Sequence, residues 1–68
     1  MNSEYLKVAE FLLNNKDGSL LDTYLNTILG RNQDPEVLAF RMSQDEFLRS
    51  VCLSEYNRRK EVKQNGLD

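Results

Sequence analysis

The chain has 68 residues, with 11 acidic and 9 basic side chains, a formal net charge of −2, one cysteine and no histidine. So short a chain forms one domain at most, and a domain of about 60 residues buries only about 60% of its unfolded surface. One cysteine excludes an internal disulfide, and without histidine a zinc or copper site lacks its usual nitrogen ligands. Acid–base and nucleophilic catalysis lack their commonest base. We therefore expect a single domain over residues 1–68 that is no enzyme, holds no metal or cofactor, and associates with other chains.

The apolar stretches of the sequence are far shorter than the roughly 20 residues that a membrane-spanning helix needs. The first residues, Met1 to Glu4, lack the basic and apolar regions of a secretory signal. The lone cysteine is typical of a reducing compartment. These features predict a cytoplasmic protein with no membrane contact.

The spacing of apolar residues predicts a first helix over about residues 3–16. Its core face follows the i, i+3, i+4, i+7 pattern through Tyr5, Val8, Ala9 and Leu12. Leu6 and Leu13 lie to one side of that face and Phe11 lies to the other. The apolar arc is therefore wider than an ordinary surface helix needs, which indicates more than one neighbour and includes a second subunit among the candidates.

A second helix is predicted over residues 20–29. Gly18 suits the left-handed position after the first helix, and Gly30 suits the same position after the second. Ser19 is the expected N-cap, with Asp22 completing a shortened capping box on the outward polar face. Because the connection is short, the first two helices are expected to pack antiparallel.

Asp34 and Pro35 predict the start of a third helix over residues 35–42, because proline is favoured at the first helical position. Ser43 and Glu46 form a capping box that favours a break and a fourth helix over residues 44–64. A single continuous helix is the alternative, since one face would then carry Val37, Phe40, Phe47, Leu48, Val51 and Cys52. The expected fold is an all-α bundle of three to four helices with a frayed tail from about residue 65.

Two residues on the inner face of the last helix have special chemistry. Cys52 is expected to be a small buried core residue rather than a reactive thiol. Glu55 continues the same face, where a fully buried carboxylate would be costly. Either the face leaves the core at Glu55, or Glu55 pairs with Arg58 or Arg59 of a second chain.

The end of the chain is basic and has lost the apolar stripe. Its candidate nucleic-acid contacts are Arg58, Arg59, Lys60 and Lys63. Cations are also favoured in the last turns of any helix, and glutamates at helical spacing can pair with them. A mildly acidic chain lacks the field of a typical nucleic-acid binder.

Protein binding is the function that the composition favours most. The apolar residues that we expect at a partner interface are Leu6, Phe11, Leu13, Leu53 and Tyr56. They predict a non-enzymatic regulatory module that forms a homodimer and binds a larger protein partner through its helices. An accessory nucleic-acid-binding protein that uses the basic last helix is the alternative.

Overall fold

A computed structural model describes the backbone of residues 3–65 and the side chains of residues 3–61. Within this range the chain forms four helices and no strand: α1 (Ser3–Asn14), α2 (Leu20–Leu29), α3 (Pro35–Gln44) and α4 (Glu46–Asn65). The all-α prediction is confirmed, and so is the break between the third and fourth helices. Of the tail predicted to fray from about residue 65, Asn65 is still helical, and the rest lies outside the described residues.

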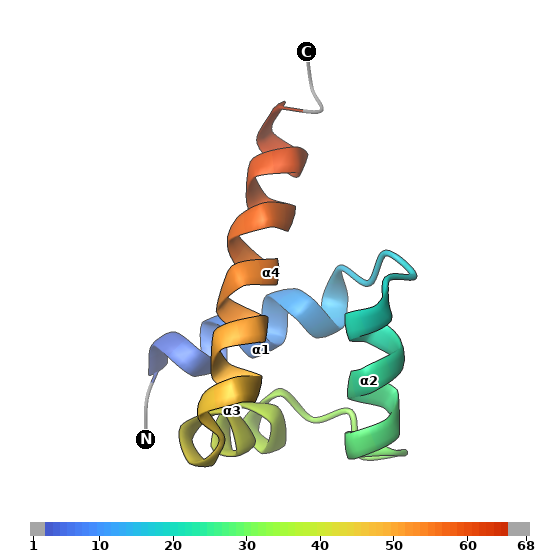
Figure 1. Ribbon diagram of the computed structural model, residues 1–68, viewed down its shortest axis with the longest axis vertical. Helices are drawn as coiled ribbons and strands as arrows, with labels where there is room; N and C mark the ends of the chain where they lie inside the picture. Colours follow the sequence, from blue (N-terminus) through green and yellow to red (C-terminus); the bar gives the residue numbers. More distant parts are fainter. Residues whose placement is uncertain (1–2, 66–68) are drawn as a thin grey trace.

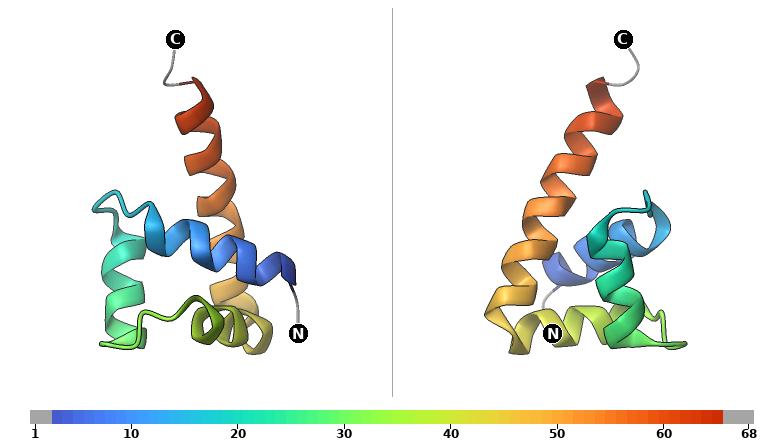
Figure 2. Two further views of the ribbon diagram at one scale, coloured as in Figure 1. Left: turned by 180° about the vertical axis from the view of Figure 1, so that it is seen from behind. Right: turned by 45° about the vertical axis from the view of Figure 1, so that its right-hand side comes forward.

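The helices are arranged around α4, the longest of them (Figure 1). α1 crosses α4 near its middle and packs chiefly on α3, and α3 also packs against α4 (Figure 1). α2 stands beside α4 and touches it at only a few positions. The second half of α4 extends beyond the other three helices, as all views show (Figure 2).

The predicted antiparallel pairing of the first two helices is wrong, because α1 and α2 meet at a corner (Figure 2). α1 ends at Asn14, two residues earlier than predicted. The side-chain amide of Asn15 donates to the carbonyl of Phe11 at 2.8 Å and closes the last turn. Gly18 does adopt a left-handed φ of 78°, but it lies in the connection rather than directly after α1. This connection gives α2 its new direction.

The start of α2 differs from the predicted capping box. Ser19 occupies the N-cap position, but its side chain makes no capping hydrogen bond. Asp22 is not outward as predicted; it is buried, with 5% of its surface exposed. Its Oδ2 accepts hydrogen bonds from the backbone N–H groups of Asp17 at 2.7 Å and Gly18 at 2.8 Å. Asp22 therefore fixes the connection that precedes its own helix.

The break between α3 and α4 is made by Asp45 rather than by the predicted Ser43. Asp45 is extended, with φ −127° and ψ 108°, and its N–H donates to the carbonyl of Arg41 at the end of α3. Its Oδ1 accepts from the N–H of Leu48 at 3.1 Å, which caps α4. Ser43 is still helical and donates to the carbonyl of Phe40. One residue thus ends one helix and begins the next.

All four helices contribute to the core. Its buried apolar residues are Val8, Ala9, Leu12, Leu21, Leu25, Leu29, Leu38, Ala39, Met42, Leu48 and Cys52. The predicted inner face of the first helix is confirmed at Val8, Ala9 and Leu12, while Tyr5 packs at the edge of the core. None of the described helices combines the length and the apolar character needed to cross a bilayer.

Candidate protein-interaction surface

Four large apolar side chains of the described residues remain exposed, and they lie on α2, α3 and α4. Leu20 is 88% exposed, Phe47 68%, Phe40 65% and Tyr24 37%. Scattered single apolar residues are normal on a protein surface, whereas a connected group indicates a binding site.

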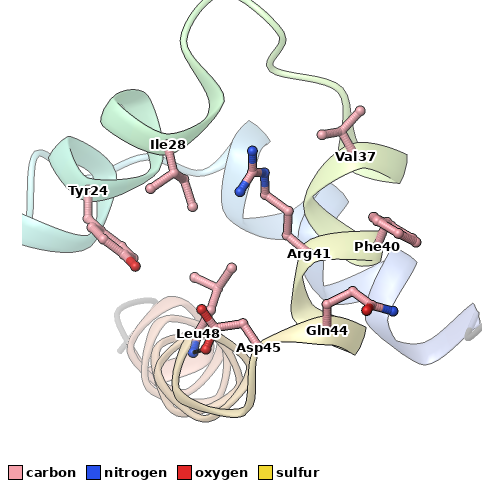
Figure 3. Close-up of a pocket in the computed structure, with 8 residues that line it drawn as sticks. All are labelled: Tyr24, Ile28, Val37, Phe40, Arg41, Gln44, Asp45 and Leu48. Carbon is pink, nitrogen blue, oxygen red and sulfur yellow. Dashed lines mark hydrogen bonds between the residues drawn. The ribbon is translucent and has the colours of Figure 1, made fainter.

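A hollow of about 520 Å³ lies where α2, α3 and the start of α4 come together (Figure 3). We call it the lower hollow. Its lining residues are Tyr24, Ile28, Val37, Phe40, Arg41, Gln44, Asp45 and Leu48. Figure 3 shows Tyr24 and Ile28 on one side and Leu48 below, with the Arg41 guanidinium reaching across toward Ile28. The lower hollow is thus mostly apolar, and its polar lining consists of the Arg41 guanidinium, the Gln44 amide and the Asp45 carboxylate.

A second hollow, the upper hollow, follows between α2 and α4 and measures about 370 Å³. Its lining residues are Leu20, Leu21, Tyr24, Phe47, Val51 and Glu55. Tyr24 lines both hollows, so the two hollows adjoin at this residue, and we call them together the trough. All four exposed apolar side chains line the trough.

The partner-interface residues predicted from the sequence lie elsewhere. Leu6, Phe11, Leu13, Leu53 and Tyr56 are all partly buried and pack against the core. The rings of Phe11 and Tyr56 meet edge to face, with centroids 5.1 Å apart. Leu53 and Tyr56 also line a separate hollow of about 420 Å³ between α1 and α4. Their place in an interface stays a prediction, and the more exposed apolar groups are those of the trough.

The candidate nucleic-acid contacts are largely engaged within the chain. Arg59 is 6% exposed and forms ion pairs with Asp17, Asp22 and Glu55. Arg59 also donates hydrogen bonds to the carbonyl of Asn15 at 3.1 Å and to Ser19 Oγ at 2.6 Å. Arg59 is therefore an internal connection between α4 and the segment that joins α1 to α2.

The neighbouring cations are placed differently from Arg59. Arg58 is half exposed and pairs with Asp17 at 2.9 Å and with Glu55. The Lys60 ammonium lies 5.1 Å from the ring centroid of Tyr56, a cation–π contact. The Lys63 side chain lies outside the described residues. The basic cluster is thus divided between internal pairing and the surface.

Glu55 meets both arginines of its own chain, so the cations proposed for a second chain are supplied locally. Hydrogen bonds from Arg58, followed by those from Arg59, lower the pKa of Glu55. Hydrogen bonds from Ser19 and Arg58 lower the pKa of Asp17 to about 2. Both carboxylates are therefore ionised at neutral pH and stabilise the position of the connection.

Cys52 and the possible metal ligands are the remaining groups whose chemistry the sequence singled out. Cys52 is fully buried, as predicted, and burial raises its pKa to about 11. It is therefore a thiol rather than a thiolate at neutral pH. No group of three or more metal-ligating side chains is found among residues 3–61.

Comparison with known proteins finds no family model, no curated protein and no solved structure that matches the chain. Function is therefore inferred from the geometry of the trough.

Proposed function

We propose that the chain is a non-enzymatic, regulatory protein-interaction module of the cytoplasm, which receives an apolar segment of another polypeptide in its trough. The single observation that carries this proposal is that the exposed apolar side chains all line two adjoining hollows, which share Tyr24. Leu20, Phe40 and Phe47 stand exposed along them. Water ordered over this surface is released when a partner covers it, which is the main favourable term in protein association.

The shape of the trough suits a helical segment of a larger partner. α2 and α4 form its two sides and α3 closes one end, while α2 and α4 touch each other at only a few positions. An amphipathic helix placed in such a groove buries side chains at i, i+3 or i+4, and i+7. The aromatic residues Tyr24, Phe40 and Phe47 are of the type that supplies most of the binding energy at interfaces.

Protein binding is favoured over nucleic-acid binding by the use that the chain makes of its arginines. Arg59 is buried among carboxylates and Arg58 pairs with two of them. A contact from Arg59 to phosphate would require it to leave these partners, which would leave the carboxylate of Asp22 buried without a cation.

Photo-cross-linking in cells tests the proposal. The photoreactive residue p-benzoylphenylalanine replaces Phe40 in the trough or, as the control, the exposed Glu10 on α1. Illumination is expected to join the chain to another polypeptide from position 40 and not from position 10. Equal cross-linking from both positions, or none from position 40, contradicts the proposal. The mass of the product separates a second copy from a different protein.

A further inference from the structure

The corner between α3 and α4 is made by a single residue. Asp45 alone leaves the helical conformation there, and hydrogen bonds of the helical i to i−4 type lie on both sides of it. Its N–H donates to the carbonyl of Arg41 at 2.9 Å, and its carbonyl accepts from the N–H of Arg49 at 2.9 Å. Glycine and proline, the strongest helix breakers, are absent from residues 36–65. A change in the backbone dihedral angles of Asp45 therefore suffices to make one helix of α3 and α4.

Two side chains hold the corner in place. Asp45 Oδ1 accepts from the N–H of Leu48 at 3.1 Å, and the Arg49 guanidinium donates to the carbonyl of Met42 at 3.2 Å. In a continuous helix each backbone N–H bonds to the carbonyl four residues earlier, so the Leu48 N–H and the Met42 carbonyl both find partners within the helix. These two contacts are thus replaced when the corner straightens.

Straightening also aligns apolar side chains that the corner keeps apart. Phe40 lines the lower hollow and Phe47 the upper one, and both are largely exposed. On one continuous helix they belong to a series with alternating spacings of three and four residues, the pattern that packs one long helix against another. The series is Val37, Phe40, Gln44, Phe47 and Val51. It runs across Asp45, so the straight helix gains an apolar side at its centre.

A straight helix carries α3 away from the α4 of its own chain. α1 and α3 both pack on α4, and all of these helices bury core residues. A second copy of the chain has an α4 with the same surface, and it can receive α3 in exchange for its own.

We propose that Asp45 is the hinge of a domain-swapped dimer. Two chains straighten at Asp45, and α1, α2 and α3 of each chain pack on α4 of the partner subunit. Both cores are rebuilt with the contacts of the monomer, and the apolar series covers the region where the two straight helices pass each other. This second folded state goes beyond the proposed function and does not depend on the occupant of the trough.

Two neighbouring substitutions move the hinge in opposite directions. Asp45→Ala removes the cap that stabilises the corner and favours a continuous helix, so it should dimerise at least about tenfold more tightly than the unaltered chain. Glu46→Pro suits the first position of α4 and the extended conformation of Asp45, but it disrupts a continuous helix. We expect Glu46→Pro to be monomeric, and its addition to Asp45→Ala to abolish the dimer.

Asp34→Ala is the matched control. Asp34 caps α3 by accepting from the N–H of Glu36 at 2.9 Å, so its loss weakens the fold in the same way without touching the hinge. Its dimerisation should stay within about threefold of that of the unaltered chain. Each sample is refolded from urea at high protein concentration, which allows chains to exchange. Sedimentation equilibrium then measures dimerisation, and circular dichroism verifies folding.

Three results would overturn the inference. Asp45→Ala that dimerises no more tightly than the unaltered chain removes the hinge, and an equal gain for Asp34→Ala assigns the effect to general destabilisation. A dimer that survives in the double variant needs no continuous helix. If Asp45→Ala does not fold, the unaltered chain is compared with Glu46→Pro: a dimer of the unaltered chain alone supports the hinge, and equal association of the two contradicts it.

Discussion

The guanidinium of Arg59 lies against the carboxylate of Asp22, with 3.3 Å between Nη1 and Oδ1, and both residues are almost completely buried. Asp22 Oδ1 accepts no hydrogen bond from the described residues, so the charge of Arg59 is its main compensation. The pair joins α4 to the start of α2 and so holds one side of the trough in place. Removing either charge alone leaves the other buried without a partner.

Replacing Arg59 by methionine is expected to destabilise the fold by about 3–5 kcal/mol, because Asp22 loses its buried cation. Arg58→Met is the matched control, since Arg58 is half exposed and its ion pairs at the surface contribute little to stability. Urea unfolding measures both changes. If Arg59→Met does not fold, the added change Asp22→Asn should restore folding. Equal effects of the two arginine variants would contradict the buried pair.

Stability is expected to decrease in acid through Asp17. Its pKa is lowered in the folded state to about 2 from an ordinary value of 3.8. The ionised form therefore stabilises the fold above about pH 4, and this contribution is lost as the pH falls toward 2. The variant Asp17→Asn lacks the contribution at every pH. Its urea midpoint should lie below that of the unaltered chain at pH 7, and the difference should shrink between pH 4 and pH 2. A difference that stays constant with pH would exclude this role of Asp17.

The cap of α4 can be tested by comparing two neighbouring substitutions. Asp45→Ala removes the acceptor of the Leu48 N–H and is expected to cost about 1 kcal/mol. Ser43→Ala changes a residue inside α3 and is expected to change stability by less than about 0.5 kcal/mol. Urea unfolding of both variants decides between the two residues as the cap. A larger loss for Ser43→Ala would return the cap to Ser43.

Exposed apolar residues of the trough should matter for association and little for the fold. Leu20→Gln changes a side chain that is 88% exposed and should alter the stability of the monomer by less than about 0.5 kcal/mol. Leu25→Ala, in the core of the same helix, should cost about 2–5 kcal/mol. Unfolding at high dilution measures these values. A large loss for Leu20→Gln would show that this residue belongs to the core.

Cys52 is expected to resist thiol reagents in the folded state, since it is fully buried and its pKa is raised to about 11. Labelling with a coloured disulfide reagent should be slow in buffer and fast in urea, because only unfolding brings the thiolate into contact with the reagent. Rapid labelling of the folded chain would contradict the burial of this residue.

Local sequence patterns predicted the positions of the helices well, because the start and end of a helix depend on residues that are neighbours in the sequence. Gly30, Asp34 and Pro35 mark helix ends through the geometry of single residues. The prediction that Ser43 caps α4 is wrong, and Asp45 is the cap. Both are good N-cap residues, and they are only two positions apart. The pattern could establish that a helix begins there, but not which residue caps it.

The trough and the buried ion pair depend on how the helices are arranged in space, which local patterns do not determine. Phe40 and Phe47 share an inner face only if the helix is continuous; the break at Asp45 leaves both exposed. Arg59 and Asp22 are far apart in sequence. One signal was available: Arg59 follows Leu48, Cys52 and Glu55 at helical spacing, and so continues the inner face of α4.

Hydroxyl-radical footprinting tests the central claim that a polypeptide covers the trough. The oxidation of Phe40 and Phe47 is compared between the chain in intact cells and the purified chain at high dilution. Tyr5, which packs at the edge of the core on α1, is the internal reference. We predict that both phenylalanines are oxidised less in cells while Tyr5 is unchanged. Equal oxidation of Phe40 and Phe47 in the two samples would contradict the claim.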